Sequence, residues 1–391
     1  MNKAVKKSEV SKKFAKTATK EAAPADVAVD DPDKSPFYIR KVKCPVCGTS
    51  GDQRWFSAKT FSEKNVDLDK HVTLYGWTEK EWEKYHPPLY YMWHCFNCHY
   101  TDSYLDFENP LKDPFSNFRQ LKDLFIDQYQ DDPRVEKIVD KLGENIDYFK
   151  MNYYQAIKLH LLAIFIQELI EDEEEKDALK IGRYYLRVGW LLREMNAIKE
   201  VKEKITPTYE KLVAFLKKGW EAMPSSENEA LIKAVDGLNL AFKTSNAIKS
   251  VVAEVDLLLM IAGIFLKMDD NEKGLKYLNL VLSRSQKTKQ KLEQRLKEMD
   301  KAEKPPPPEE IRQNEIQLKK LDALTNKTRD IMSDIQAERT KKEKEKARAI
   351  MKTLGERPPL EIREILIKKG VDKRVAIQLT PEQKKKFLGL F

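Results

Sequence analysis

The spacing of apolar residues changes along the chain and separates segments of different predicted structure. Between about residues 37 and 109 aromatic residues are dense, and four of the six tryptophans fall there. Within this segment FYIRKVK (37–43) and LYYMWH (89–94) have the composition of strands, and each leads into a cysteine pair. The intervening TEKEWEKYH (78–86) predicts a short helix, capped by Thr78 with Glu81 three residues later as in a capping box.

Helical spacing replaces this pattern from about residue 110 to residue 284. Further helices are predicted over 178–196, 209–224, 227–243 and 250–267, and another begins within 269–282. Pro224 is expected to end the second of these. Before them, one predicted helix places its apolar residues on a single face, at Ile157, Leu161, Leu162, Phe165 and Leu169.

Two of these helices carry small residues at the spacing of a tetratricopeptide repeat, in which small side chains let paired helices touch. A stack of such helices offers a groove for partners. The alternative is an irregular helical bundle whose small residues permit close packing. The matching positions are Ile261, Ala262, Phe265, Gly274, Leu278 and Val281 and, 73 residues before the first pair, Val188 and Gly189 with Leu192.

After Arg284 the chain consists almost wholly of charged helix-forming residues, broken by four prolines at 305–308. Segments 275–303 and 309–350 are expected to fold back on each other as a long helical hairpin. A heptad seam runs through the second segment, but polar residues interrupt it, which favours packing against a partner or a neighbouring helix. The apolar seam residues are Ile311, Leu318, Leu321, Met332 and Ile335, and the interruptions are Asn314, Thr325 and Thr328.

All four cysteines fall in two C-x-x-C units, CPVCG (44–48) and CFNC (95–98). The turn between paired cysteines lets both sulfurs converge on one ion, so two units form a tetrathiolate set. Pro45 stiffens the first turn, and Gly48 can take the positive φ that commonly follows the second cysteine. In the second unit Phe96 and His99 stand at these positions, and histidine tolerates left-handed geometry better than most residues. The pattern predicts a closed, structural zinc site on Cys44, Cys47, Cys95 and Cys98.

Three other interpretations of the cysteines stay open. Iron in a rubredoxin-like site takes the same ligands, and a redox dithiol needs one activated C-x-x-C at a helix start. A catalytic zinc needs an open position, which four thiolates close unless His94 or His99 replaces one of them. Each histidine is expected to be a neighbour of the site rather than a ligand.

The segment between the cysteine pairs carries residues from which a hydrolase site can be imagined, but a solvated helix face is the expected role. No nucleophile elbow, Walker loop, dinucleotide fingerprint or zincin helix occurs in the sequence, so no catalytic residue is predicted. The residues in question are His71, His86, Glu79, Glu81 and Glu83.

These features predict a mainly α protein of five regions. A disordered basic arm (1–36) precedes a zinc-ribbon-like β module (37–109) and a tetratricopeptide-like helical stack (110–284). A charged helical hairpin (285–354) and a C-terminal helical tail (355–391) follow. The apolar end of the tail is expected to dock on this body or on another protein through Phe387, Leu388, Leu390 and Phe391.

The net charge of +8 is unevenly placed, because residues 1–20 and 339–391 are strongly basic and the rest is mildly acidic. Basic ends can dock on nucleic acid, anionic lipid or an acidic protein face, and a solubilising arm is the alternative for residues 1–20. No run of 18 or more apolar residues predicts a transmembrane helix. The basic start lacks the apolar region of a secretion signal, so a cytoplasmic location is expected.

Several motifs resemble the bacterial "domain of unknown function 2225" family, whose members combine a two-knuckle cysteine module with tetratricopeptide-like helices. The similarity covers roughly residues 40–285 and rests on CPVCG, PPLYYMWHCFNCHY (87–100) and YYLRVGWLLRE (184–194). It implies the architecture but no biochemical role, because the family has no established activity. The sequence departs from the family pattern at Phe96, His99 and Gly189. The shared positions are the four cysteines, Tyr91, Trp93, Tyr100, Tyr185, Leu186, Arg187, Trp190, Leu191, Arg193 and Glu194.

The sequence favours a non-enzymatic adaptor or scaffold whose helical domain binds a protein partner. Arg187 and Arg193, on the helix around Trp190, either line a binding groove or pair with acidic residues of the next helix. A second hypothesis is association with nucleic acid or the ribosome through the zinc ribbon and the basic ends. An enzyme built on the zinc is the least favoured reading.

Overall fold

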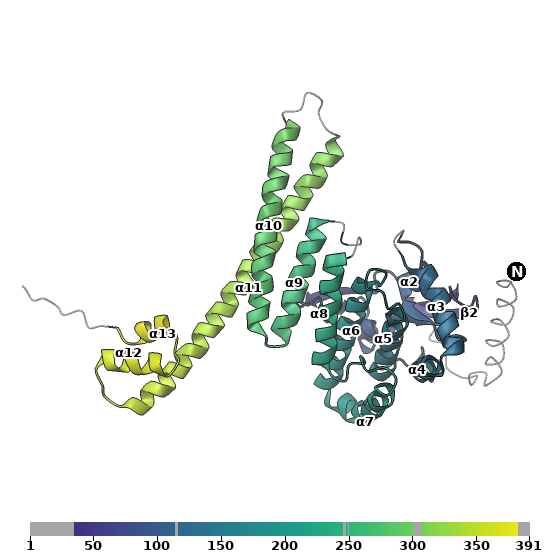
Figure 1. Ribbon diagram of the computed structural model, residues 1–391, viewed down its shortest axis with the longest axis horizontal. Coiled ribbons are helices and arrows are strands. Elements are labelled where there is room, and N and C mark those ends of the chain that lie inside the picture. The colour runs from purple at the N-terminus through teal and green to yellow at the C-terminus, as the bar shows by residue number, and fades with distance from the viewer. Residues whose placement is uncertain (1–34, 114–115, 245–247, 249, 301–306, 382–391) are drawn as a thin grey trace, which may run out of the picture. The chain divides into compact units, whose positions relative to one another are not determined.

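The computed structural model describes residues 35–113, 116–244, 248, 250–300 and 307–381. It is mainly helical, and the described chain contains helices α2 to α13 and three two-stranded antiparallel sheets (Figure 1). The chain divides into two compact units, residues 1–270 and residues 271–391, and each is described by itself. The basic arm predicted over 1–36 and the apolar end Phe387–Phe391 lie outside the described residues, apart from Ser35 and Pro36.

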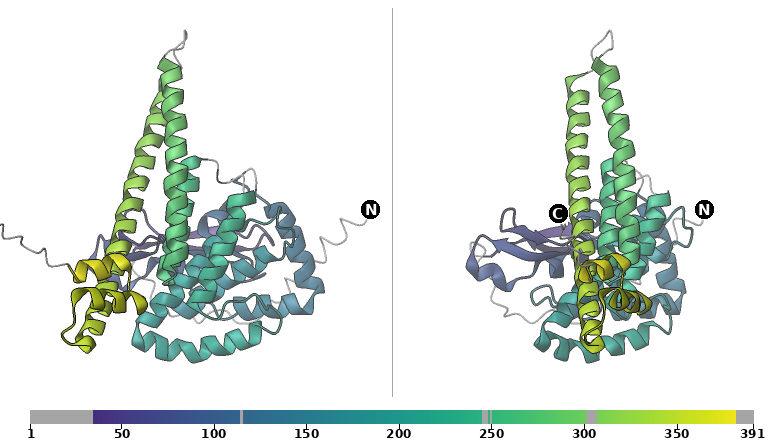
Figure 2. Two further views of the ribbon diagram at one scale, coloured as in Figure 1. Left: turned by 60° about the vertical axis from the view of Figure 1, so that its left-hand side comes forward. Right: turned by 90° about the vertical axis from the view of Figure 1, so that its left-hand side faces the viewer.

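Three hairpins form the β part of the first unit, and Figure 2 shows them in purple and blue. Strand β1 (Phe37–Lys43) pairs with β2 (Ser50–Phe56), so that Lys43 lies opposite Ser50. Strand β3 (Phe61–Val66) pairs with β4 (Val72–Trp77), and β5 (Met92–His94) pairs with β6 (Thr101–Ser103). Each cysteine pair occupies the turn of one hairpin, the first between β1 and β2 and the second between β5 and β6.

Some local predictions for this part were wrong. The segment 78–86 forms only a short 3₁₀ helix, η1 (Lys80–Lys84), and Thr78 does not cap it: its hydroxyl donates to Lys59 O at 2.7 Å. The segment 89–94 begins in a second 3₁₀ helix, η2 (Pro87–Tyr90), so only its last three residues form a strand. Strands β2 to β4 were not predicted: β2 and β3 are rich in polar residues, and β3 and β4 are largely exposed or only half-buried.

Eight helices build the rest of the described first unit. Most predicted helices are present, but α7 ends at Leu216 rather than at Pro224 and carries Pro207 inside it. Helix α5 is buried around its whole circumference from Ala156 to Gln167, so the prediction of a single buried face was wrong. The helices are α2 (Tyr104–Glu108), α3 (Phe118–Asp131), α4 (Pro133–Gly143), α5 (Tyr153–Glu168), α6 (Ala178–Ala197), α7 (Lys199–Leu216), α8 (Glu227–Thr244) and α9 (Val251–Lys267).

Glycines bring α6 and α8 into backbone contact. A Cβ atom on Gly182 would lie 2.9 Å from the amide nitrogen of Leu238, and one on Gly237 would lie 2.9 Å from the Cα of Gly182. Because no side chain separates the helices there, they approach as closely as small residues allow. Gly189, which the tetratricopeptide pattern singled out, faces Leu231 of α8. Small residues therefore serve close packing here, while a tetratricopeptide repeat itself stays a prediction.

The second unit contains an antiparallel helical hairpin of α10 (Asn271–Asp300) and α11 (Pro308–Leu354). Ion pairs join Lys289 to Asp322 and Arg295 to Glu310. The polar residues that interrupt the predicted seam are themselves buried at heptad positions of α11: Asn314, Thr325 and Thr328. Thr325 and Thr328 donate their hydroxyls to backbone carbonyls of α11 at 2.7 Å, which satisfies them in the seam.

The end of α11 packs with α12 (Pro359–Lys368) and α13 (Lys373–Leu379) around a small core of their own. Its fully buried residues are Ala347, Leu366, Val371, Val375 and Ala376. Among the residues that the structure covers, no helix combines the length and the apolar character needed to cross a bilayer.

Candidate metal centre

The two cysteine turns have the same backbone hydrogen bonds although their sequences differ. In the first turn the Gly48 amide donates to Cys44 O at 2.9 Å, and the Cys44 amide donates to Thr49 O at 2.9 Å. In the second turn the His99 amide donates to Cys95 O at 2.8 Å, and the Cys95 amide donates to Tyr100 O at 2.9 Å. Both turns need a left-handed residue, and φ is +75° at Gly48 and +61° at His99. The second turn thus forms without glycine.

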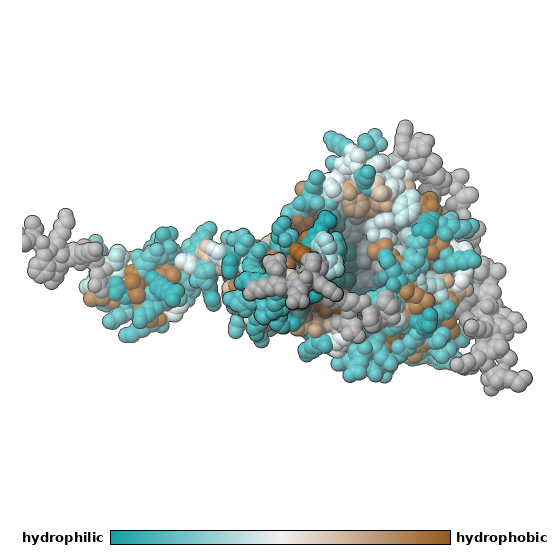
Figure 3. Space-filling view, turned by 90° about the horizontal axis from the view of Figure 1, so that it is seen from above, coloured by the Kyte–Doolittle hydropathy of each residue, from teal (hydrophilic) through white to brown (hydrophobic). Residues whose placement is uncertain are grey.

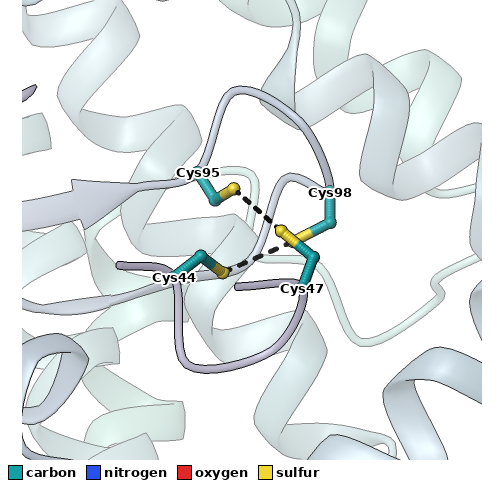
Figure 4. A group of neighbouring side chains, drawn as sticks. All are labelled: Cys44, Cys47, Cys95 and Cys98. Carbon is teal, nitrogen blue, oxygen red and sulfur yellow. Dashed lines mark hydrogen bonds between the residues drawn. The ribbon is translucent and has the colours of Figure 1, made fainter. Parts of the chain in front are cut away.

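The four sulfur atoms converge from the two turns, as Figure 4 shows, and all lie within 4.8 Å of one another. Cys44 Sγ lies 3.6 Å from Cys98 Sγ, and Cys47 Sγ lies 3.6 Å from Cys95 Sγ, so each short contact joins one turn to the other. An ion with four sulfur ligands at about 2.3 Å in tetrahedral geometry separates them by about 3.8 Å. The sulfur positions therefore fit a four-coordinate metal ion.

The charges of the cluster also favour a cation. Hydrogen bonds from Cys44 lower the pKa of the Cys47 and Cys95 thiols. A hydrogen bond with Cys47 raises the pKa of Cys44, and burial raises that of Cys98. Protein alone therefore stabilises only some of the four thiolates, because crowded negative charges repel one another. A divalent cation at the centre would allow all four to ionise.

Neighbouring groups hold the turns in place. The Asn97 amide points at Cys47 Sγ at 3.6 Å, and Lys122 Nζ of α3 donates to Pro45 O at 2.9 Å. The buried amide of Gln53 on β2 donates to His94 O at 2.9 Å and accepts from the His94 amide at 3.4 Å. Such groups around the ligands fix their orientation before a metal arrives.

His94 and His99 are neighbours of the cluster, engaged with each other. His94 Nδ1 donates to Thr101 Oγ1 at 2.8 Å, because the Thr101 hydroxyl itself donates to His99 O at 3.0 Å. The remaining His94 nitrogen, Nε2, accepts from His99 Nδ1 at 3.4 Å. Burial lowers the pKa of both histidines, which agrees with neutral rings. Within the described residues, the group able to hold a metal comprises cysteines only.

A cavity of about 270 Å³ adjoins the cluster on the side of Cys44 and Cys95. The hairpin turn at Thr49–Gly51 and the side chains of Phe96 and Asn97 contribute to its wall. It gives solvent and small ions a route to two of the four cysteines. Three of its polar side chains are already engaged: Gln53 with the His94 backbone, His94 with Thr101, and Asn97 with Cys47.

The histidines between the cysteine pairs do not lie on a solvated helix face, so that prediction was wrong. Of the five residues in question, only the three glutamates, Glu79, Glu81 and Glu83, are exposed. His71 is buried, and its Nε2 donates to Glu194 Oε1 at 2.8 Å. His86 Nε2 donates to the other oxygen, Oε2, at 2.7 Å.

Arg193 completes this second cluster. Its guanidinium contacts Asp69 at 3.0 Å, Glu227 at 2.7 Å and His71 Nδ1 at 3.3 Å. His71 must accept that last bond, so it carries its proton on Nε2. The cluster fastens the turn between β3 and β4 to α6. No spacing in the sequence could have joined residue 71 to residue 194, because the contact depends on tertiary packing.

One comparison with known proteins gives a match. The family model described as "Uncharacterized protein conserved in bacteria (DUF2225)" matches residues 37–304. Neither the search of curated proteins nor the search of solved structures returns a similar chain. The matched region contains the cysteine turns and all helices of the first unit.

Proposed function

The chain belongs to the DUF2225 family, and from this premise we propose that it is a non-enzymatic adaptor with a structural zinc ion. The observation that carries the proposal is the convergence of four cysteine sulfurs within 4.8 Å. Four sulfur ligands fill the tetrahedral shell of zinc, which leaves no position for a substrate or a reactive water. The zinc, held by Cys44, Cys47, Cys95 and Cys98, would join the two hairpins and supply no chemistry beyond that.

The protein-binding role rests on the helical part of the first unit. In the view of Figure 3, the apolar residues among those described form small brown patches between polar ones rather than one continuous surface. A mixed surface of this kind suits a partner that binds and leaves, since permanent interfaces are more apolar. The partner is proposed to be a protein that docks on the helices α5 to α9, in the tetratricopeptide-like groove that the sequence predicts.

Two measurements test this proposal. Metal analysis of protein purified without added zinc should find one zinc per chain. A coloured protein that contains iron would instead support the rubredoxin-like interpretation. A metal-free, fully folded protein with four titratable thiols would end the structural-metal proposal. Affinity capture of the native full-length chain, with and without nuclease, should recover a reproducible protein partner in both samples.

A second candidate function is nucleic-acid binding by the C-terminal part of the second unit. Residues 339–381 carry thirteen Lys or Arg against six Asp or Glu, and they include a folded three-helix core. Lys341, Lys344, Arg348 and Lys352 recur at helical spacing along one side of α11 and are exposed or half-exposed. Such a row of cations can follow a phosphate backbone, as the basic ends led us to expect.

The salt dependence of binding separates this candidate from the first. Binding to a 20-nucleotide single strand should weaken steeply with salt, and exchanging Lys341 and Arg348 for glutamine should reduce that slope by about 1.4. Exchanging Arg312 and Lys319, elsewhere on α11, is the matched control. If the Lys341 and Arg348 variant keeps its affinity for the strand, or if nuclease does not change what is captured, nucleic-acid binding is excluded. Only the adaptor proposal then remains.

A further inference from the structure

Arg187 of α6 lies among aromatic side chains. Its guanidinium carbon is 3.5 Å from the centre of the Tyr91 ring and 5.5 Å from that of Trp190. A guanidinium that stacks on a ring keeps its N–H donors in the plane of the group, where they stay free to bind an oxyanion. Arg187, Tyr91 and Trp190 are each only partly buried, so the group is open to a ligand.

Arg187 differs from its charged neighbours because it lacks an acidic partner. Among the residues that the structure describes, it forms no ion pair and no hydrogen bond. On the same helix Arg193 is bound by Asp69 and Glu227, and Lys180 is bound by Asp102 and Asp106. The two arginines that the sequence could not distinguish thus have different environments.

The acid nearest along this face of α6 is not available to Arg187. Glu194 lies two helical turns further on, and both of its oxygens accept from histidines, His71 and His86. These bonds lower the pKa of Glu194 against the effect of its burial, so it stays ionised. An anion for Arg187 must therefore come from outside the described chain.

The surroundings of Arg187 resemble the energetic centre of a protein interface. Tyr91 contacts Tyr104 edge-on at 5.9 Å, and Tyr104 stacks on Trp55 at 4.1 Å. Both Tyr104 and Trp55 are half-buried. Tryptophan, tyrosine and arginine are the residues that most often dominate binding energy between proteins. A surface of these residues around one unpaired cation suits a peptide with an acidic side chain.

An orphaned nitrogen lies behind the same rings. His160 is fully buried beside Tyr91, with the two ring centres 6.0 Å apart, and its Nδ1 donates to Ala156 O at 2.8 Å. Its Nε2 has no partner among the described residues. Within the described chain this buried nitrogen is therefore an unsatisfied acceptor next to the Tyr91 ring.

We propose that Arg187, with Tyr91 and Trp190, binds the carboxylate of an aspartate or glutamate side chain on an acidic segment of a protein partner. This assignment rests on the proposed adaptor function and names the chemistry that the adaptor recognises. The planar carboxylate matches the planar guanidinium, which allows two parallel hydrogen bonds. The rings would pack against the backbone and methylene groups on either side of the acidic residue.

The test uses the full-length protein and an array of capped octapeptides, each made in an acidic form and in a form with asparagine and glutamine. The best acidic peptide should bind about tenfold or more tighter than its amide form, since a charged hydrogen-bonded pair is lost. In Arg187→Gln this ratio should fall to about one, and Arg187→Lys should keep only part of it. Arg183→Gln, at an exposed position of the same helix, is the matched control.

Each other outcome contradicts the proposal. A ratio near one in the unaltered protein, or a ratio that survives in Arg187→Gln, excludes carboxylate recognition at this residue. Inorganic phosphate that competes as well as the peptide assigns the site to small anions instead. Partner capture separates failure of this proposal from failure of the adaptor proposal. If Arg187→Gln still captures the partner that the unaltered protein captures, the adaptor proposal holds and the partner docks on another surface.

Discussion

The two cysteine turns reach the same geometry by different means. In the first turn nothing lies within 4 Å of the place where a Cβ atom of Gly48 would sit, so the left-handed conformation there depends on glycine itself and not on packing. In the second turn His99 takes the left-handed conformation, and its ring is pressed against Gly143 at the end of α4. A Cβ on Gly143 would lie 2.3 Å from His99 Nδ1.

The difference shows what can replace glycine in a metal-binding turn. A non-glycine residue at positive φ costs about 1–2 kcal/mol, which the first turn avoids. In the second turn the His99 ring stacks on His94 at 5.3 Å and packs on α4, and these contacts offset that cost. The left-handed residue of the first turn therefore needs no packing partner, whereas that of the second turn is held by the helical domain behind it.

The largest expected effect comes from removing a ligand, and it tests whether the two turns serve one ion. Cys44→Ser and Cys98→Ser take one sulfur from each turn. Both should abolish tight metal binding and unfold residues 37–109, because a structural zinc ion contributes on the order of 10 kcal/mol. Metal content after purification and near-ultraviolet circular dichroism measure the two effects.

Asn97→Ala is the control for this pair, since it removes only a contact to Cys47 Sγ. It should retain the metal and release it somewhat faster to a chelator. If serine in one turn removed the metal and serine in the other left it bound, the four sulfurs would not form one site.

Gly143→Ala should affect the second turn alone. The new methyl group would overlap the His99 ring, which cannot swing away without leaving its stack on His94. We expect a loss of about 1–3 kcal/mol in the free energy of unfolding, the usual cost of overpacking. Gly51→Ala, near the first turn, meets only Gln53 Nε2 at 3.7 Å and should cost little. Equal denaturation midpoints for the two variants would mean that His99 is not constrained by α4.

The stability of the segment that supports the second cysteine turn should depend on pH through Lys158 of α5. Its Nζ donates to Glu144 O at 2.6 Å, next to Gly143, and burial lowers its pKa from 10.5 to about 8. Between these values the unfolded chain binds more protons than the folded one, so stability rises as pH increases from about 8 to 10.5. The rise should be at most about 3 kcal/mol, reduced by solvent screening.

Lys158→Met should remove this contribution, so the unfolding free energy of wild type minus that of the variant should increase from about pH 8 to 10.5. Chemical denaturation at several pH values between 7 and about 10.5 measures it. Burial raises the pKa of tyrosines such as Tyr100 and Tyr148, which lowers the stability of both proteins as pH passes 10, so the lysine is isolated by the difference between the two curves. A difference that does not change between about pH 8 and 10.5 would show that Lys158 keeps its ordinary pKa in the fold.

The sequence predicted the grouping of the four cysteines because the turn of each C-x-x-C pair is encoded by neighbouring residues. Paired cysteines, Pro45 and Gly48 describe a turn without reference to the rest of the chain, and His99 was recognised as tolerant of positive φ. Helices α5, α6, α8 and α9 were also predicted from the sequence, whereas α2, α3 and α4 were not singled out. The burial of α5 was not predicted, because a fully buried helix has no polar face to mark it.

The contacts that the sequence could not provide are those between distant segments. Glu194 binds His71 and His86 only because the β3–β4 turn lies on α6, and the same packing separates Arg193 from Arg187. The seam of α11 packs against the neighbouring helix α10, as expected, but how its polar residues fit there could not be foreseen. Thr325 and Thr328 look like interruptions until their hydroxyls are seen to bond to the backbone of their own helix.

The smallest expected effect isolates the conformation of the first turn. At Gly48 there is open space but φ is +75°, so Gly48→Ala should cost about 1 kcal/mol through backbone strain alone. Gly48→His should cost about the same, because no helix packs against this position as α4 packs against the His99 ring. Gly48→Asn should cost less, since asparagine tolerates the left-handed region. Denaturation midpoints of metal-loaded protein rank the three variants, and a histidine variant as stable as glycine would mean that the second turn needs no support from α4.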